Sequence, residues 1–293
     1  MNVVVFGAGS LGSLVGAVLA RRHDVTLVGR APHVEAVRAD GLRVEGEESF
    51  VAHPSATTGG EGLSADLAVV TVKSFDTGEA AAALATGDVG AALSLANGMG
   101  NEATLAGTLD APVVAGATAL GASLRGPGRV AWLGRGRTTV GPWTDDAGRA
   151  AHRAGGALRV AGFPTTVTDA VRRRLWEKLA ANAAINPLTA LAGVRNGAVA
   201  DPPLAATAAA AARETARAAR HAGVDLRDDR AVETATRVAR ATAENRSSMA
   251  RDLEAGRRTE VDAINGHVVD RIGAERAPVN AALSALVRAR DDR

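Results

Sequence analysis

Three polar side chains in the middle of the chain have the types and the spacing that a reaction would need. Lys178, Asn182 and Asn186 follow one another at intervals of four residues, and the residues between them are almost all apolar. Ala, Leu, Glu and Lys favour helix, so the stretch 174–190 is predicted to be a helix with these side chains along one narrow face. Buried polar groups need partners, and a single bound ligand could satisfy all three.

The lysine in this row stands out in a chain that uses arginine almost everywhere else. Lys73 and Lys178 are the only lysines among the 34 Lys and Arg residues. Arginine stays protonated at any ordinary pH, whereas a desolvated lysine ammonium can release a proton and act as a general acid. The alternative is that two lysines survive by chance in an arginine-biased sequence. On these grounds Lys178 is a candidate general acid, and both interpretations remain open.

A glycine-rich motif near the N-terminus predicts a dinucleotide-binding turn. A β-branched run, residues 2–6, passes directly into this motif, and a helical stretch follows. The motif consists of Gly7, Ala8, Gly9, Ser10, Leu11 and Gly12. Gly7 is expected to make the tight turn, Gly9 to let the backbone approach a pyrophosphate, and Gly12 to let the helix pack on the strand. The helix N-terminus would supply amide donors to the phosphates.

The residue after the second predicted strand, 24–28, bears on the choice of cofactor. An NAD site usually has Asp or Glu there to bind the ribose hydroxyls. This chain has Gly29-Arg30 and no acidic residue until Glu35. A guanidinium suits a 2′-phosphate, so NADPH/NADP+ is the predicted cofactor. The alternative is that Arg30 is an ordinary surface arginine.

Two further strand ends carry polar side chains. Lys73 follows the predicted strand 66–72, and Asn97 follows the predicted strand 91–96. Ligands of open parallel sheets bind beyond the carboxyl ends of the strands, so both side chains are expected at the same edge. Asn97-Gly98 is also an ordinary turn dipeptide, which is the competing interpretation of Asn97.

The remaining pattern predicts an α/β fold with two parts. Strands alternate with helices through about residue 167, with hairpins predicted at 42–52 and, at one edge of the sheet, within 120–141. Helices are predicted beyond that point, over 204–221 and 231–251, with another beginning at a Thr259 cap. We predict an N-terminal Rossmann-type dinucleotide-binding domain, 1–167, followed by an all-α C-terminal domain, 168–293.

Composition excludes several classes of function. The formal net charge is only +2 and aromatic residues make up 2% of the chain, which argues against a nucleic-acid partner. No apolar run approaches the roughly 18 residues that cross a bilayer, and no basic segment precedes the apolar N-terminus, so a cytoplasmic protein is expected. The histidines share no ligand spacing and cysteine is absent, so no metal is expected. The alanine-rich helices could form a homodimer surface or pack internally.

The motifs together resemble the ketopantoate reductase (2-dehydropantoate 2-reductase) family. The matching stretches, in the family's order, are Gly7–Gly12, Thr71–Lys73, Asn97–Gly100, Leu175–Ala190, Glu244–Met249 and Arg258–Gly266. The run with Lys178, Asn182 and Asn186, followed by Pro-Leu-Thr, is the most specific of them. The resemblance implies NADPH-dependent reduction of 2-dehydropantoate to (R)-pantoate, a step toward pantothenate and coenzyme A.

The resemblance also implies a role for each matching residue. Lys178 corresponds to the proton donor, and Glu260 to an acid near cofactor and substrate. Four residues correspond to positions that hold the substrate's hydroxyl and carboxylate, namely Asn182, Asn186, Asn196 and Ser248. Three correspond to cofactor contacts, namely Lys73, Asn97 and Ala122. Asn97, with Lys178 and Ser248, could also donate to the carboxylate of the 2-keto acid.

One departure from the family pattern leaves room for other functions. Many relatives have Thr-His where this chain has Ala119-Leu120. This favours considering a paralogue that reduces a different 2-keto acid. A protein of another class, a non-catalytic NADPH-binding sensor, would not need to retain Lys178.

Overall fold

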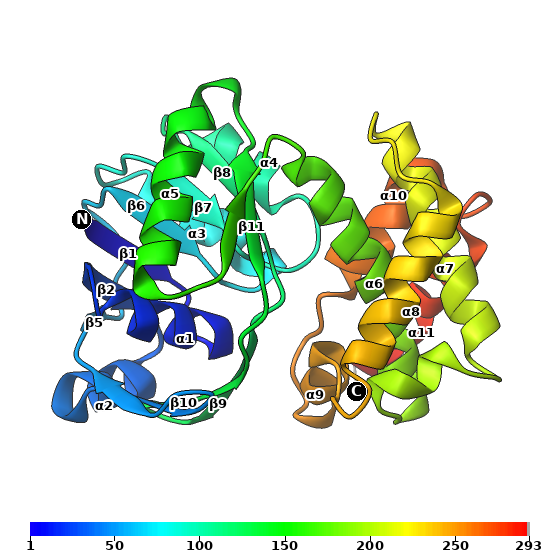
Figure 1. The fold of residues 1–293 in the computed structure, drawn as a ribbon, viewed down its shortest axis with the longest axis horizontal. Coiled ribbons are helices and arrows are strands. Elements are labelled where there is room, and N and C mark those ends of the chain that lie inside the picture. Colours follow the sequence, from blue (N-terminus) through cyan, green and yellow to red (C-terminus); the bar gives the residue numbers. More distant parts are fainter. Residues whose placement is uncertain (292–293) are drawn as a thin grey trace. The chain divides into compact units, whose positions relative to one another are not determined.

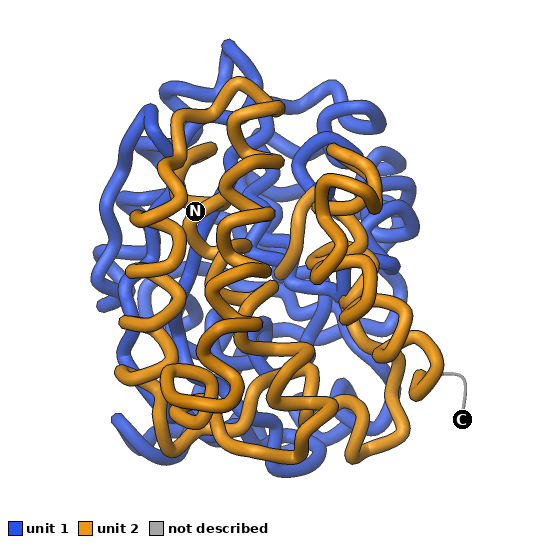
Figure 2. Tube along the Cα trace, turned by 90° about the vertical axis from the view of Figure 1, so that its right-hand side faces the viewer, with its two compact units in different colours: residues 1–96, 100–171 blue, residues 97–99, 172–293 orange. Residues whose placement is uncertain are grey.

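The computed structural model describes residues 1–291, which form two compact units (Figure 2). Among these residues, the first unit comprises 1–96 and 100–171, and the second comprises 97–99 and 172–291. The first contains a parallel sheet with helices, and the second is helical throughout its described residues. The predicted fold class, a Rossmann-type α/β part followed by an all-α part, is therefore confirmed.

The first unit is built on an eight-stranded sheet (Figure 1). Its strands, in spatial order, are β12 (Thr165–Val167), β11 (Thr138–Pro142), β8 (Val113–Thr118), β7 (Ala92–Ser94), β6 (Leu67–Val70), β1 (Asn2–Phe6), β2 (Asp24–Val28) and β5 (Ser55–Thr57). Adjacent strands are parallel except for β11 against β8. The apolar runs that predict these strands are buried because helices cover both faces of such sheets.

The helices of the first unit connect these strands. They are α1 (Ser10–Leu19), α2 (Ala31–Asp40), η1 (Ser74–Asp76), α3 (Thr77–Leu84), α4 (Asn101–Thr108), η2 (Asp145–Ala147) and α5 (Gly148–Ala161). Helix α1 is buried from Gly12 to Leu19, and α5 packs its Ala and Leu side chains into the same core. The β1–α1–β2 connection therefore places the glycine-rich turn at the carboxyl end of β1.

A second, four-stranded sheet corrects one expectation about the segment 120–141. Its strands, in spatial order, are β4 (Phe50–Ala52), β3 (Leu42–Gly46), β10 (Arg129–Gly134) and β9 (Gly121–Gly126). The predicted hairpin 42–52 is confirmed, but β9 and β10 join it instead of the edge of the large sheet. Trp132, on β10, is buried in the core of the first unit, where its ring contacts Phe163.

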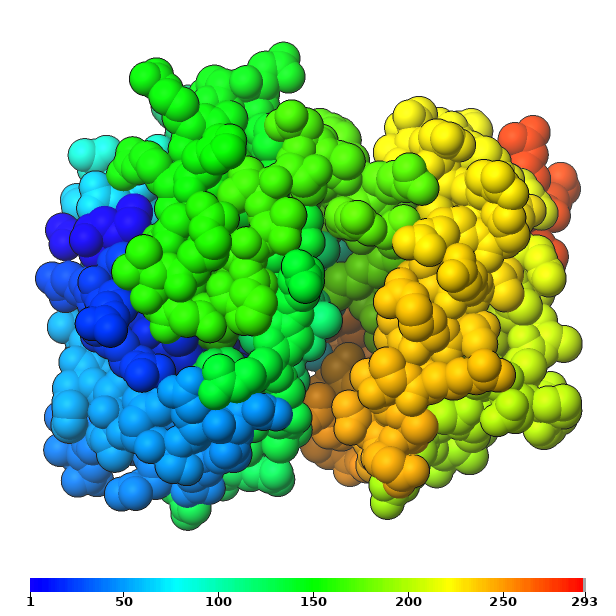
Figure 3. All heavy atoms as spheres, in the orientation of Figure 1, coloured from blue at the N-terminus to red at the C-terminus, as the bar shows by residue number. Residues whose placement is uncertain are grey.

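The second unit packs helices around an alanine-rich core. Its elements are α6 (Val171–Ala192, of which Val171 belongs to the first unit), η3 (Asn196–Ala200), α7 (Ala205–His221), α8 (Asp228–Ala241), α9 (Ser248–Glu254), the π-helix η4 (Asp262–Gly266), α10 (His267–Ile272) and α11 (Pro278–Asp291). The middle of α6 is buried in this core, and α8 lies on the face of the unit that Figure 3 shows in yellow and orange. No helix of residues 1–291 has the length and apolar character to cross a membrane.

The predicted continuous helix over 231–251 is wrong, because the chain leaves helix between α8 and α9. The carbonyls of Ala243 and Asn245 accept hydrogen bonds from the backbone of Gly197 and Asn196 in η3, so they are not available to a helix. Ser247 then begins a new helix, since its Oγ accepts a hydrogen bond from the backbone N–H of Ala250.

The segment after Thr259 begins as predicted and then departs from a regular α-helix. Thr259 Oγ1 accepts a hydrogen bond from the backbone N–H of Val261 at 3.4 Å, and the helical backbone starts at Val261. The next five residues form the π-helix η4, which no sequence pattern indicated. Single-turn π-helical segments are frequent at functional sites, and this one adjoins Glu260.

Candidate functional site

The glycine-rich turn of the first unit has space where a phosphate would approach. Gly7 has φ +106°, and a Cβ there would lie 2.7 Å from the Val72 backbone nitrogen. A Cβ on Gly12 would lie 2.2 Å from the Gly7 carbonyl oxygen, so this glycine lets α1 pack on the turn. A Cβ on Gly9 would meet nothing within 4 Å. Because no side chain caps α1, this open position and the helix N-terminus fit a pyrophosphate.

Side chains of other members of the motif contact neighbouring parts of the first unit. Ser10 Oγ accepts a hydrogen bond from the backbone N–H of Leu124 at 3.0 Å, which ties β9 to the turn. Ala8 is buried, and Leu11 packs against the core. Ala122, on β9, also packs against this core, so a cofactor contact there would come from its backbone.

Arg30 and Lys73 follow strands that are neighbours of β1 in the parallel sheet. Arg30 comes two residues after β2 and immediately precedes α2, with its side chain exposed. Lys73 follows β6 and immediately precedes η1, half-buried. Because β2, β1 and β6 run in the same direction, both residues and the glycine-rich turn lie along one edge of the sheet. That edge is where dinucleotides bind in this class of fold.

A buried histidine beneath the turn was not identified from the sequence. His33 Nδ1 accepts a hydrogen bond from the backbone N–H of Gly128, so the ring proton resides on Nε2 and points at Ser13 Oγ, 3.0 Å away. The Ser13 hydroxyl in turn donates to the Ala8 carbonyl at 3.2 Å. Burial lowers the pKa of His33. The only sequence signal is a histidine on an apolar helix face three residues after Arg30.

In the second unit, α6 carries the three polar side chains predicted from their spacing. Lys178 and Asn182 are half-buried, and Asn186 is 7% exposed. All three lie on one continuous helix, which runs through Pro187 to Ala192. An ammonium and two amides on a mainly apolar helix can donate hydrogen bonds to a carbonyl, a carboxylate or a hydroxyl.

Asn196 and Ser248 are placed by contacts near the end of α6. Asn196 is buried and donates from Nδ2 to Thr242 Oγ1 at 3.0 Å, so the amide is oriented by the turn that follows α8. Thr189 Oγ1 donates to Ser247 Oγ at 2.8 Å, which joins α6 to the start of α9. Ser248 is the first residue of α9 and is half-buried.

Asn97 and Glu260 contact each other although 163 residues separate them. Asn97 Nδ2 donates to Glu260 Oε2 at 3.4 Å, and the Glu260 side chain is buried. The backbone N–H of Met99 donates to the Ala263 carbonyl at 2.9 Å. Residues 97–99 therefore pack with the second unit, and the structure brings Asn97 to Glu260 and not only to the end of β7.

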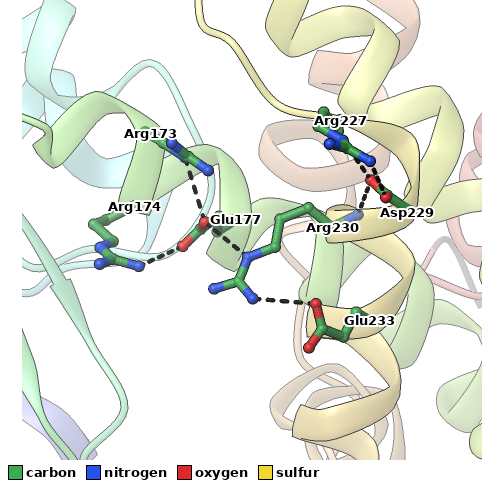
Figure 4. Close-up of polar contacts among 7 residues, drawn as sticks. All are labelled: Arg173, Arg174, Glu177, Arg227, Asp229, Arg230 and Glu233. Atoms are coloured by element: carbon green, nitrogen blue, oxygen red, sulfur yellow. Dashed lines mark hydrogen bonds and ion pairs between the residues drawn. The ribbon is translucent and has the colours of Figure 1, made fainter.

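An ion-pair cluster around Glu177, the residue that precedes Lys178, was also not identified from the sequence (Figure 4). The Glu177 carboxylate is buried and contacts three arginines, with Arg174 Nη1 at 2.8 Å, Arg230 Nε at 3.5 Å and Arg173 Nε at 3.6 Å. Arg230 comes from α8 and also pairs with Glu233. The cluster therefore ties the turn of α6 that carries Lys178 to α8.

Comparison with known proteins assigns both parts of the sequence to one family. A model described as "Ketopantoate reductase PanE/ApbA" matches residues 3–145, and one described as "Ketopantoate reductase PanE/ApbA C terminal" matches residues 170–291. A relative from Halobacterium salinarum, named 2-dehydropantoate 2-reductase, is 43% identical over 98% of each chain.

Solved structures share the fold over the whole chain. A PanE/ApbA family ketopantoate reductase from Ralstonia eutropha JMP134 superposes with a TM-score of 0.89 at 34% identity, covering 100% of this chain and 99% of its own. A ternary structure of D-mandelate dehydrogenase with NADH and anilino(oxo)acetate has a TM-score of 0.92, covering 100% and 98% of the two chains. At 22% identity, the latter shows likeness of fold alone.

Proposed function

Because this chain belongs to the ketopantoate reductase family, we propose that it reduces 2-dehydropantoate to (R)-pantoate with NADPH in the cytoplasm. The observation that carries the proposal is the row on α6: one of only two lysines in the chain precedes two asparagines on the same helix. Reduction of a 2-keto acid needs a proton donor for the carbonyl oxygen and neutral groups that recognise a hydroxyl, and this row offers both.

Lys178 supplies the proton in this proposal. NADPH, when bound, supplies the hydride that forms the new C–H bond at C2 of the keto acid. The carbonyl oxygen gains negative charge as its π bond breaks, and the Lys178 ammonium stabilises that charge and donates a proton to the oxygen. The neutral amine that remains recovers its proton from water, so the step is balanced in atoms and charge.

The remaining polar residues of the second unit bind and orient the substrate. Asn182, Asn186 and Asn196 recognise its hydroxyl without adding charge, and loss of such a hydroxyl from a substrate can cost about 10⁴-fold in specificity. Ser248 and Asn97 donate to the carboxylate. Glu260 holds the Asn97 amide through the 3.4 Å hydrogen bond, which supports a fixed orientation of that donor.

The first unit binds the cofactor in this proposal. The open position at Gly9 and the uncapped N-terminus of α1 support a pyrophosphate at the turn. Arg30, exposed beside the carboxyl end of β2, would pair with the 2′-phosphate, and Lys73 would add a second positive charge at the same edge. These residues support a preference for NADPH over NADH.

The test is an assay of NADPH oxidation by the purified protein with ketopantoate. Lys178→Ala should lower kcat by at least about 100-fold, the contribution typical of a general acid, while NADPH still binds in a calorimetric titration. Arg213→Ala is the matched control, since it removes an exposed cation on α7 of the same unit, and its kcat should equal that of the wild type. Undiminished turnover by Lys178→Ala would remove Lys178 from the mechanism.

A second candidate is a reductase for a different 2-keto acid. It is favoured by Ala119-Leu120, since Ala119 is exposed and Leu120 packs against the core, so neither side chain offers a polar group. A panel of 2-keto acids compared by kcat/KM separates the two candidates. A calorimetric signal for NADPH with no turnover on any acid of the panel would instead indicate a sensor.

A further inference from the structure

Helix α6 contains a backbone carbonyl that its own helix cannot satisfy. In an α-helix the carbonyl of residue 183 accepts a hydrogen bond from the N–H of residue 187. Residue 187 is a proline, which has no N–H, although the helix continues through it to Ala192. Ala183 falls between Asn182 and Asn186 in sequence, within the turns of α6 that carry the row used by the proposed reaction. An unsatisfied carbonyl at this buried position would loosen that row.

Asn265 supplies the missing donor. Its Nδ2 donates to the Ala183 carbonyl oxygen at 3.0 Å, and its side chain is fully buried. Asn265 is the fourth residue of the π-helix η4, whose segment begins next to Glu260. The same segment binds residues 97–99, because the Ala263 carbonyl accepts from the Met99 N–H. The Asn265 side chain therefore links the backbone of α6 to the segment that follows Glu260 and contacts Met99.

The orientation of the Asn265 amide is fixed by a chain of buried groups. Its Nδ2 also donates to Asn280 Oδ1 at 2.8 Å. Asn280 cannot be rotated to present its amino group there, because its Nδ2 donates to the Ala211 carbonyl and to the Glu214 carboxylate, which both only accept. Glu214 in turn accepts from the backbone N–H groups of Val279 and Asn280 at the start of α11. Asn265 must therefore turn its amino group toward α6.

We infer that Asn265 is a positioning residue, which replaces the hydrogen bond that Pro187 removes from α6 and thereby fixes Lys178, Asn182 and Asn186 relative to Glu260. The inference rests on the proposed function for its effect on catalysis. Asn265 acts through the backbone of α6 and does not itself need to touch the substrate. Its two donors go to Ala183 and Asn280. Loss of the contact should therefore affect the geometry of the row and not the binding of NADPH.

A double-mutant cycle with Pro187 separates this role from ordinary packing. Asn265→Leu removes the donor at similar volume, and Pro187→Ala restores the backbone N–H that can satisfy the Ala183 carbonyl. We expect Asn265→Leu to lower kcat/KM for ketopantoate by about 10- to 100-fold, as for a small displacement of catalytic groups, with less than about a twofold change in the Kd of NADPH. The double variant with Asn265→Leu and Pro187→Ala should have a kcat/KM at least about threefold higher than that of Asn265→Leu alone.

Hydrogen exchange gives a second measurement that does not depend on turnover. Amides of residues 184–186 and 188–191 should exchange faster in Asn265→Leu and return toward the wild-type rate in the double variant. Thr77→Val is the matched control, because it also removes one buried hydrogen bond, from Thr77 Oγ1 to Asn101 Oδ1 in the first unit, which shares no partner with Asn265 or Asn280. It should leave both the exchange of α6 and kcat/KM unchanged.

The two measurements distinguish failure of this inference from failure of the proposed function. Wild-type protein that does not reduce ketopantoate would overturn the proposed function, while the exchange rates would still decide whether Asn265 holds α6. Equal exchange of residues 184–186 and 188–191 in wild type and Asn265→Leu would overturn the inference. The inference would also be overturned if Asn265→Leu lowered kcat/KM by the same factor with Pro187 and with Ala at position 187.

Discussion

His33 donates from Nε2 to Ser13 Oγ, 3.0 Å away, beneath the glycine-rich turn of the first unit. The opposite ring nitrogen accepts from the Gly128 N–H, so the ring must be neutral to make both contacts. The Ser13 hydroxyl in turn donates a hydrogen bond to the Ala8 carbonyl. A single neutral imidazole thus connects the β9–β10 turn, α1 and the proposed phosphate-binding turn.

This arrangement predicts that protonation of His33 destabilises the folded chain. Burial lowers the pKa of His33 below its usual value of 6.5, so the unfolded state binds a proton more readily than the folded state. The stability that the neutral ring contributes is complete above pH 6.5 and declines as the pH falls below 6.5 toward the lower folded-state pKa. Urea unfolding at pH 7.5 and pH 5.5 should show this loss in the wild type.

His33→Gln should reduce the difference in the free energy of unfolding between pH 7.5 and pH 5.5, since glutamine does not titrate. His267, whose pKa is also lowered by burial and by Arg271, remains in both proteins and accounts for part of the residual difference. His152→Gln, on an exposed position of α5, is the control and should retain the full difference. An unchanged difference in His33→Gln would contradict the assigned role of His33.

The open space at Gly9 predicts that two glycines of the turn respond differently to alanine. A Cβ on Gly9 meets nothing within 4 Å, so Gly9→Ala should fold with a free energy of unfolding within about 0.5 kcal/mol of the wild type. The added methyl would occupy space proposed for the pyrophosphate, and the Kd of NADPH should rise about tenfold or more, equivalent to at least about 1.4 kcal/mol.

Gly12→Ala is the contrasting variant, because its Cβ would lie 2.2 Å from the Gly7 carbonyl oxygen and 2.4 Å from Thr71 Oγ1. Such overpacking should lower the free energy of unfolding by about 1–3 kcal/mol. Thermal unfolding and calorimetric titration of both variants test the prediction. Equal stability losses in the two variants would show that the space at Gly9 does not exist in solution.

Arg30 is predicted to determine the preference between the two nicotinamide cofactors. Arg30→Ala removes the proposed partner of the 2′-phosphate, and a hydrogen bond to a charged group contributes about 1.5–3 kcal/mol. The KM for NADPH should therefore rise about 10-fold or more, while the KM for NADH, which lacks the phosphate, stays within about twofold. Arg22→Ala removes another exposed arginine of the same unit and should change neither value. A parallel rise for both cofactors would assign Arg30 to another role.

Much of the fold follows from local sequence patterns, and the exceptions have physical causes. Apolar runs and the glycine-rich motif predicted β1, β2, β6 and β7 of the large sheet and the β1–α1–β2 unit, because both signals are local, whereas the three-residue strands β5 and β12 were not predicted. The pairing of β10 with β3 could not be predicted, since it joins two segments that are far apart in the sequence. The break before Ser247 was missed because hydrogen bonds to η3, some 46 residues earlier in the chain, compete with helix there.

The candidate site also contains features that could be predicted from the sequence and features that could not. The row on α6 could be predicted because periodicity in one helix fixes which side chains share a face. Contacts between distant segments could not be predicted in this way, and the hydrogen bond between Asn97 and Glu260 is one example. Asn265 lies within a motif that the sequence analysis recognised, but its role depends on Pro187, 78 positions earlier, and on a π-helix with no sequence signature. The burial of the Glu177 carboxylate is likewise explained by its contact with Arg230, which is 53 residues away.

The Glu177 cluster predicts that stability and catalysis are linked at the start of the α6 row. Glu177→Gln keeps the side-chain volume but removes the charge that faces Arg174, Arg173 and Arg230. The arginines are partly exposed and screened by solvent, so the free energy of unfolding should fall by only about 1–2 kcal/mol. Because Lys178 is the next residue, kcat should also fall, with less change in the KM for NADPH.

Asp229→Asn is the matched control, because it removes the charge that pairs with the exposed Arg227 at the start of α8, while its amide oxygen can still accept from the backbone N–H of Arg230 (Figure 4). Exposed pairs of this kind contribute little, so its unfolding midpoint and kcat should match those of the wild type. Urea unfolding and steady-state kinetics on both variants test the prediction. Equal behaviour of Glu177→Gln and Asp229→Asn would mean that the link between α6 and α8 depends on apolar packing, and that the buried carboxylate does not hold Lys178.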